Sequence, residues 1–380
     1  MLSKYDEFLC HQTTNYLNEV NTSERNWTEK VWGAASNHDG SIMLDWGFGK
    51  YINRNVMDAF GIVVINGKQY NVRASRELQP DVDEITVGPL SYEILEPLYK
   101  IRVVLDENDQ GISFDIVFDG TFPISEEPHS FQKKKGVVVS DARRFYQYGT
   151  VSGTVTVEGK TYVVKSEEWS AARDRSWGIR PIVGLPPKGS GWCMAEGLDD
   201  QGMEPPPSNL LSVVIEFAGA QFKDYALHYW QVKTEDGHVL QTMGSHISYR
   251  YGHPNCGDPR KEVSISSVDH STEFDPDTGR PTSARATIEA SDGRKMTMDF
   301  KLQSFCFAGA GGYFGYKNWN HGKWMGANVV EGEVLDLTDA DDMAGLLNRY
   351  DDYACEVTCD GEIGHGLYNI TTAAKIEIPQ

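Results

Sequence analysis

Residues 149–164 read GTVSGTVTVEGKTYVV, and this stretch decides the fold class. Valines alternate with small polar residues up to Val157, Glu158-Gly159 interrupt the run, and a second β-prone run follows from Lys160 to Val164. Two such runs joined by two residues that favour a tight turn predict a β-hairpin. The pattern recurs at Asn66-Gly67, between runs 59–65 and 68–73, and at Asp292-Gly293, between runs 284–290 and 295–302.

Most of the remaining chain also predicts strands. Further β-prone runs lie at 101–105, 112–118, 211–217 and 225–232. Helical patterns are scarce, with one amphipathic segment at 3–18 that begins at Ser3 and a second at 340–349 that opens at Asp339. Regular hairpins without alternating helices are typical of a sandwich or barrel, so we expect an all-β protein with few short helices.

The length of the chain predicts two domains. Its 380 residues exceed the roughly 250–300 at which single hydrophobic cores stop growing. Prolines and glycines gather between about 181 and 208, which is the best candidate for a connection. We therefore expect an N-terminal domain over 1–185, a Pro/Gly-rich connection over 186–207 and a C-terminal domain over 208–380.

The charge of the chain argues against two classes of partner. A formal net charge of −20 gives no cationic surface for nucleic acid or an anionic membrane, and the run Lys133–Lys135 is better explained as a solvated loop. No segment reaches the ~18 apolar residues of a membrane span, and the first residues lack the apolar core of a signal peptide. We expect a cytoplasmic protein with reduced cysteines, and a homodimer is compatible with the sequence.

Signatures of common cofactors are absent from the sequence. It contains no P-loop, no H-E-x-x-H and no G-x-S-x-G motif, and the glycines at 309–312 do not form a dinucleotide fingerprint. Cys355 and Cys359 have no histidines at ligand spacing, so they are better explained as core thiols than as a zinc site. We expect neither metal nor cofactor.

The segment 169–180 holds the strongest candidates for chemistry. It contains Trp169, Arg173, Asp174, Arg175, Trp177 and Arg180. On a strand, Arg173, Arg175 and Trp177 share one face, whereas Asp174 points to the other. A lone carboxyl in an apolar cavity would suit a general acid. The alternative is that Asp174 pairs with Arg173, Arg175 or a distant arginine and only holds a strand or loop in place.

Aromatic residues near this segment are candidate pocket walls. Tyr146 and Tyr148 share a strand face at spacing i, i+2, and with Trp169 and Trp177 they would stack on a ring or stabilise positive charge. Each of them could instead be an ordinary core residue. His321, among glycines and aromatics at 312–324, could move protons or simply cap a turn.

The run Arg173-Asp174-Arg175-Ser176-Trp177-Gly178 resembles a motif of the lipocalin-like superfamily that contains the carotenoid hydratases (hydroxyneurosporene synthases), the AttH-like proteins and some pericyclases. It is most similar to uncharacterised bacterial members with an R-D-x-S-W-G-x-R core, which also share blocks like 53–58, 73–76, 87–90 and 320–326. The likeness to these members spans 27–370. It implies two lipocalin-like barrels, with Asp174 where the hydratases place their proposed proton donor.

Two departures from the family pattern matter. The carotenoid hydratases carry His-Asn where this chain has Arg175-Ser176, which changes the charge beside the acid. Asn369 stands where relatives often have Glu, so a role of that Glu cannot be carried over.

The combined expectation is a lyase, hydratase or isomerase without cofactor, acting on an apolar isoprenoid or an aromatic, lignin-dimer-like molecule. We expect Asp174, Tyr148 and His321 to be catalytic and Trp169, Arg173, Arg175, Trp177, Tyr146 and Arg180 to bind substrate. The arginines could bind a substrate phenolate or carboxylate, or only pair with Asp174. The rival hypothesis is a carrier that holds a hydrophobic molecule without changing it.

Overall fold

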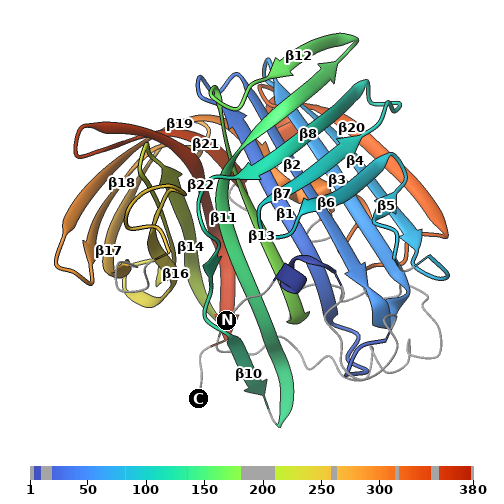
Figure 1. Cartoon of the computed structure of the whole chain (residues 1–380), viewed down its shortest axis with the longest axis horizontal. Coiled ribbons are helices and arrows are strands. Elements are labelled where there is room, and N and C mark those ends of the chain that lie inside the picture. The colour runs from blue at the N-terminus through green and yellow to red at the C-terminus, as the bar shows by residue number, and fades with distance from the viewer. Residues whose placement is uncertain are drawn as a thin grey trace.

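The chain forms two antiparallel β-barrels, one nearly closed and one closed by eight strands (Figure 1). The computed structural model describes residues 4–9, 19–81, 83–134, 136–180, 210–257, 263–312, 316–343 and 351–377. The predicted all-β fold with two barrels is confirmed. The predicted connection over 186–207 lies outside the described residues.

The N-terminal barrel is a 14-stranded sheet with the order β20-β4-β3-β2-β1-β13-β11-β8-β7-β6-β5, and three short strands also pair with β11. Its main strands are β1 (Trp27–Asn37), β2 (Ile42–Tyr51), β3 (Val56–Ile65), β4 (Lys68–Glu77), β5 (Thr86–Val87), β6 (Leu90–Glu96), β7 (Lys100–Leu105), β8 (Ile112–Gly120), β11 (Val137–Val157), β13 (Trp169–Ile179) and β20 (Asn328–Asp336). The short strands are β9 (Ser125–Glu126), β10 (Ser130–Lys134) and β12 (Lys160–Val164). The sheet curls until β5 and β6 contact β3.

The C-terminal barrel closes in sequence order, with β22 returning to β14. It consists of β14 (Leu210–Gln221), β15 (Tyr225–Thr234), β16 (Val239–Tyr249), β17 (Val263–Phe274), β18 (Pro281–Ala290), β19 (Lys295–Phe307), β21 (Asp351–Cys359) and β22 (Glu362–Glu377). The described helical segments are η1 (Lys4–Glu7), η2 (Ile52–Arg54), η4 (Ala308–Gly311), η5 (Tyr316–Asn318) and α2 (Ala340–Met343). None of them is long and apolar enough to cross a membrane.

The three predicted hairpins are confirmed, with turns at Asn66-Gly67, Glu158-Gly159 and Asp292-Gly293. Both asparagine and glutamate at the first turn position adopt a positive φ, as do the glycines that follow them. The two predicted helices are seen only in part. The described part of 3–18 contains the 3-10 turn η1, and that of 340–349 contains the single turn α2.

One strand crosses between the halves. β20 comes from the second half of the sequence but pairs along its whole length with β4 at the edge of the N-terminal sheet. Figure 1 shows this strand, in orange, next to the blue strands β4 and β3. Hairpin patterns are local, so they could not predict a pairing between strands that lie ~250 residues apart.

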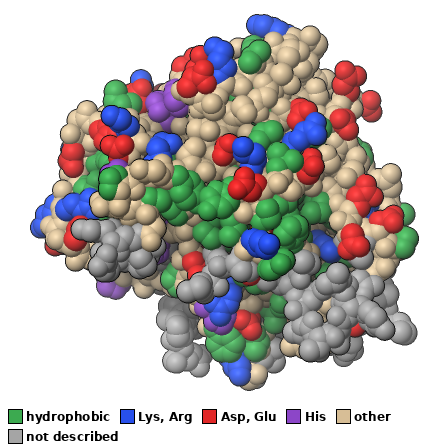
Figure 2. All heavy atoms as spheres, in the orientation of Figure 1, with side chains coloured by type: hydrophobic (Ala, Val, Ile, Leu, Met, Phe, Trp, Pro, Cys, Tyr) green, Lys and Arg blue, Asp and Glu red, His purple; other side chains and the backbone are tan. Residues whose placement is uncertain are grey.

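The barrels meet through the outer face of the N-terminal sheet. Because side chains alternate along a strand, part of the residues of β1, β2, β3, β11 and β13 leave the interior of the N-terminal barrel, and the apolar ones among them pack against C-terminal strands. One continuous hydrophobic cluster therefore joins Trp32, Phe60, Tyr146 and Tyr148 to the core of the C-terminal barrel. Figure 2 shows hydrophobic side chains across the middle of the drawn face, where the two barrels adjoin.

Candidate functional site

Strand β13 separates its arginines from its carboxylate. Arg173 points into the N-terminal barrel, where Glu7 of η1 binds it at 2.6 and 2.8 Å and the amide oxygen of Gln147 accepts two further bonds. Its guanidinium also lies over the rings of Phe118 and Phe145. Burial raises the pKa of Glu7, but the charge and hydrogen bonds of Arg173, the Leu98 amide and the charge of Arg175 together outweigh burial, and the pKa is lowered. Arg173 is therefore held in a fully buried ion pair.

Arg175 lies on the same side of β13 as Arg173. It pairs with the buried carboxylate of Glu29 and donates to the Phe8 and Ser176 carbonyls at 2.7 and 2.6 Å. The guanidinium also lies over the ring of Trp177, 5.4 Å from its centroid. Arg173, Arg175 and Trp177 thus line the opposite side of the sheet from Asp174.

Asp174 faces the C-terminal barrel from a row of residues that crosses five strands. In register across the sheet, Tyr146 of β11 lies opposite Asp174, which lies opposite Trp32 of β1. Gly47 of β2 and Phe60 of β3 continue the row. A Cβ at Gly47 would lie 2.4 Å from the Phe60 ring, so glycine is required for this ring to pack there. The row forms an aromatic surface around one carboxylate.

A buried pair of carboxyl groups lies beside this row. Asp45 of β2 is fully buried, and Asp352 of β21 reaches it from the C-terminal barrel. Burial raises the pKa of Asp45 well above its ordinary value, and the neighbouring Asp352 raises it further. Burial likewise raises the pKa of Asp352 to about 7. Two adjacent buried carboxyls cannot both ionise easily, so the pair holds at least one proton near neutral pH.

Three neighbours define the surroundings of the Asp45–Asp352 pair. Asn369 Nδ2 donates to Asp352 Oδ1 at 2.9 Å, and the Cys306 thiol lies 3.7 Å from Asp45 Oδ2. Trp32, one residue row away from Asp45, interacts with its carboxyl group and favours the ionised form. Asn369 thus serves as a hydrogen-bond donor to the buried acid.

Asp174 lies between this pair and solvent. Its side chain is 20% exposed and lies 3.5 Å from Arg144 Nε, so a distant arginine pairs with it rather than Arg173 or Arg175. The charge of Asp174 also raises the pKa of Asp352, which places the two carboxylates within electrostatic reach. Arg144 is 30% exposed and also contacts Glu127 at 3.5 Å. Asp174 and Arg144 therefore form the solvent-facing edge of the site.

Lys30, next to this edge, is a buried amine. Burial lowers the pKa of Lys30 well below its ordinary value; Arg180 contributes, whereas Asp58 and Asp174 oppose the shift. Arg180 is half-buried and donates to the Ser176 hydroxyl at 3.2 Å. Of the predicted substrate-binding arginines, Arg180 is the one whose charge acts on this site.

Tyr146 and Tyr148 lie at the contact between the barrels, as an edge-on pair with ring centroids 5.2 Å apart. Tyr146 packs on Phe217 of β14 at 5.1 Å and on His228 of β15 at 4.9 Å. Tyr148 donates to the carbonyl of Leu227 at 3.3 Å. Burial raises the pKa of both tyrosines well above the ordinary value, so both remain phenols. They provide an aromatic wall with hydroxyl groups.

His321 lies at the far side of the cluster. Its Nδ1 is 3.6 Å from Asp58 Oδ1, and its ring meets Phe60 edge-on at 6.2 Å. Burial lowers the pKa of His321 to about 4, and Lys30 adds to this shift while Asp58 opposes it. The histidine is therefore neutral at physiological pH. The Gly322 amide binds the other oxygen of Asp58 at 2.6 Å, so backbone positions this pair.

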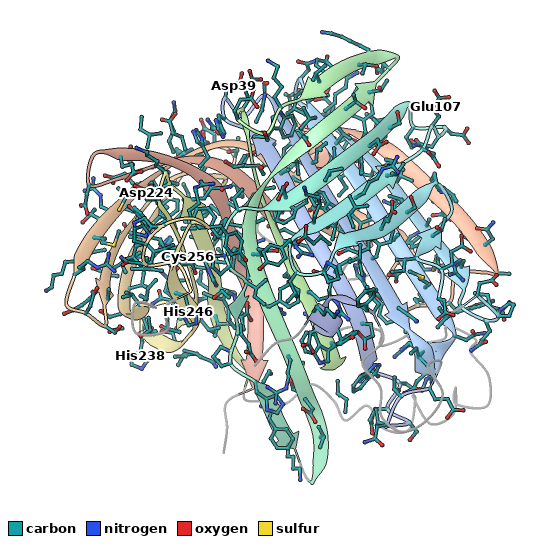
Figure 3. All side chains as sticks on the ribbon, in the orientation of Figure 1. Asp39, Glu107, Asp224, His238, His246 and Cys256 are labelled. Carbon is teal, nitrogen blue, oxygen red and sulfur yellow. The ribbon has the colours of Figure 1, made fainter. Side chains whose placement is uncertain are left out.

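Trp169 lies away from the Asp45–Asp352 pair. It is buried at the start of β13, beside a pocket of about 520 Å³. The pocket lies at the end of the N-terminal barrel marked by Asp39 in Figure 3, and its lining also includes His38, Lys160 and Tyr162. Nearby, His38 stacks on His365 of the C-terminal barrel at 4.0 Å.

Several buried polar atoms between the barrels have no hydrogen-bond partner among the described residues. They come from both barrels: Asp45 Oδ1, Asp352 Oδ2, Tyr146 Oη and His228 Nε2. Leaving such atoms unsatisfied costs about 1–3 kcal/mol each. Asp45 and Asp352 interact with each other, as do Tyr146 and Tyr148, which offsets part of this cost. The described residues contain no group of His, Cys, Asp and Glu arranged to hold a metal ion.

Sequence reasoning missed the Asp45–Asp352 pair and His228. A signal for Asp45 does exist, because IMLDWGFGKY at 42–51 places one carboxylate in an otherwise apolar strand. Asp352 and His228 carry no comparable signal. They become notable only because the C-terminal barrel docks them against the outer face of the N-terminal sheet.

The chain matches a family model and is similar to solved structures. No curated protein matches the chain. A crystal structure of CghA with Sch210972 is similar at a TM-score of 0.49 and 12% identity, over 92% of this chain and 89% of that one. A crystal structure of kievitone hydratase from Nectria haematococca is similar at a TM-score of 0.43 and 11% identity, over 91% of this chain and 89% of that one. A family model matches residues 2–373, and the chain belongs to that family of unknown function (DUF8625).

Proposed function

We propose that this protein is an acid–base enzyme that acts, without a cofactor, on a small apolar or aromatic molecule held between its two barrels. The observation that carries the proposal is the Asp45–Asp352 pair, one carboxyl from each barrel. A general acid works best when its pKa lies near the working pH, and burial brings Asp352 to about 7. A protein that only held its ligand would have no use for such a pair.

The surroundings of the Asp45–Asp352 pair indicate the substrate class. Trp32, Phe60, Tyr146, Tyr148 and Phe217 present aromatic rings, and the unpartnered polar atoms lie among them. Aromatic faces pack on apolar molecules and stabilise positive charge that develops when a double bond is protonated. An isoprenoid alkene or an aromatic dimer fits this environment better than a sugar or nucleotide.

Each polar group has a distinct role in the proposal. The protonated member of the Asp45–Asp352 pair donates a proton to an unsaturated carbon of the substrate. Asp174, at the solvent-facing edge and within electrostatic reach of Asp352, returns a proton to the pair. Tyr148 shapes the wall, and His321 with Asp58 completes the far side. Arg173, Arg175 and Trp169 lie outside this site.

The test uses Asp352→Asn and Asp45→Asn, which keep the shape of the side chain but remove the acid. Wild type and variants are incubated with a panel of terpenoid alkenes and aromatic dimers, and products are identified by mass spectrometry. We expect turnover to fall by ~10²–10⁴ in both variants. Asp269→Asn, an exposed carboxylate on β17, is the matched control and should keep wild-type activity.

The carrier hypothesis gives a different result. Ligand binding without product in wild type, or turnover that Asp352→Asn leaves unchanged, would rule out the carboxyl pair as the acid. Asp174→Asn separates the two carboxylate roles. If Asp174 relays protons, turnover in this variant should be slow and should rise with the concentration of added buffer, because small acids in solution can replace the missing carboxyl group.

A further inference from the structure

His228 faces the same aromatic wall as the Asp45–Asp352 pair, from the C-terminal barrel. The imidazole is 3% exposed and packs on Tyr146 at 4.9 Å, on Phe217 at 6.0 Å and on Tyr148 at 6.2 Å. In register, it lies opposite Gly219 of β14, where a Cβ would approach the Tyr148 hydroxyl to 2.0 Å. The absence of a side chain at Gly219 lets Tyr148 and His228 lie side by side.

His228 is a neutral imidazole in the folded protein. Burial lowers the pKa of His228 to about 3, with a smaller contribution from His246, so the ring is neutral at physiological pH. A neutral imidazole has one nitrogen that donates and one that accepts. Nε2 is buried and has no hydrogen-bond partner among the described residues. In the tautomer that carries its proton on Nδ1, Nε2 is the accepting nitrogen and lies available to a bound molecule.

The base and the acid are linked through Tyr146. This tyrosine contacts His228, and the charges of Asp352 and Asp174 contribute to the raised pKa of its phenol. Phe217, which also touches His228, lies opposite Asn369, the residue that holds Asp352. A molecule in contact with the ring of Tyr146 could therefore reach both a proton donor and a proton acceptor.

We propose that His228 is the base of this site and that the reaction is a proton shift that moves a double bond within an apolar, unsaturated substrate. This inference rests on the proposed function and narrows it from acid–base chemistry in general to isomerisation. The preferred substrate carries a C–H bond made acidic by a neighbouring carbonyl or aromatic ring.

The step balances without any co-reactant. A C–H bond of the substrate breaks and its proton goes to His228 Nε2, while its electron pair forms the new double bond. The old double bond takes the proton of the Asp45–Asp352 pair and forms a C–H bond. The imidazolium then returns a proton to the carboxylate by way of bound water or Asp174, and substrate and product are isomers.

The test follows a β,γ-unsaturated ketone, cyclohex-3-enone, in D₂O with the full-length protein. Wild type should form the conjugated enone and place deuterium at the carbon that gains the proton. His228→Ala should lose ~10²–10⁴ of this rate, and added imidazole should restore part of it by entering the vacated space. His270→Gln is the matched control, because His270 is also buried with a pKa near 3 but faces the interior of the C-terminal barrel.

The outcomes separate the two proposals. Loss in Asp352→Asn with wild-type rates in His228→Ala would overturn the role of His228 and leave the acid in place. Equal loss in His228→Ala and His270→Gln, without rescue by imidazole, would show that His228 is only structural. Rates unchanged by Asp352→Asn, or no conversion beyond the rate in buffer, would overturn the proposed function together with this inference.

Discussion

At the scale of single residues, the protonation state of each buried carboxyl group depends on whether a cation lies beside it. Asp45 and Asp352 are conventional carboxylates in sequence, yet both lie in an apolar interface and their proton affinity rises. Glu7 is just as buried, but the Arg173 guanidinium at 2.6 Å keeps it ionised. A buried carboxyl group therefore becomes an acid or a structural anion according to whether a cation lies within contact distance.

Asp352→Asn should stabilise the protein at alkaline pH. A carboxyl with a folded pKa near 7 and an unfolded value near 3.8 destabilises the fold as pH rises between these values. Asn mimics the protonated form, so the gain should be on the order of 2–4 kcal/mol at pH 8 and close to zero at pH 4. Thermal unfolding at a series of pH values measures it, with Asp269→Asn as control. A variant less stable than wild type at pH 8 would contradict the assignment.

At the scale of elements, a strand divides its functions between its two faces. β13 sends Arg173 and Arg175 into ion pairs that hold η1 and β1, and sends Asp174 to the contact between the barrels. β20 is held by a comparable ion pair at the sheet edge. Arg73 of β4 binds both oxygens of Glu333 at 2.7 and 2.6 Å and lies over Tyr316 and Trp319.

Glu333→Gln should loosen β20 from the sheet. The variant leaves the Arg73 guanidinium, 1% exposed, without its counter-charge, which should cost about 2–4 kcal/mol. Hydrogen exchange followed by mass spectrometry should show faster exchange in 328–336 than in β14 or β15. Glu93→Gln is the control, since Glu93 also faces an arginine but is 61% exposed, and it should change little. Unchanged protection of β20 would show that backbone pairing alone holds it.

At the scale of the whole molecule, neither barrel contains the site by itself. Asp45, Asp174 and Tyr146 come from the N-terminal sheet, and Asp352, Asn369 and His228 come from the C-terminal barrel. The contact also stacks His38 on His365, and burial lowers the pKa of His365 to about 4. The interface therefore buries neutral imidazoles together with a carboxyl pair that holds a proton. Because both kinds of group titrate differently in the unfolded chain, the stability of the protein depends on pH.

Stability should be greatest near pH 6.5. His228, His270, His321 and His365 have folded pKa values of about 3 to 4, so the unfolded chain takes up their protons as pH falls below 6.5 and stability is lost. The buried carboxyls oppose folding increasingly as pH rises from about 3.8; below pH 6.5 the four histidines outweigh them, and above it only the carboxyls still act. Thermal unfolding from pH 4 to 8 checks this. His321→Gln should reduce the loss of stability below pH 6.5. The control His238→Gln, at an exposed histidine, should leave that loss unchanged. A stability that rises steadily to pH 8 would contradict this prediction.

Local sequence predicts some features of the candidate site, but most of its contacts are visible only in the tertiary structure. The alternation of β13 correctly separates Asp174 from Arg173 and Arg175, because side-chain direction along a strand is a local property. The partner of Asp174 is not local. Arg144 lies on β11, and register between strands brings the two side chains to the same face. Trp169 lies beside a different pocket because it is at the start of the same long strand, β13, away from Asp174.

By itself, the sequence determined the hairpins, the all-β class and the two faces of β13, since all three depend on alternation and turn chemistry within a few residues. The tertiary structure alone decided that β20 joins the first sheet, and that Asp45 meets Asp352 across the barrel contact. These pairings join residues separated by hundreds of positions. Burial of apolar surface drives them, and it depends on the whole assembled fold rather than on any local pattern.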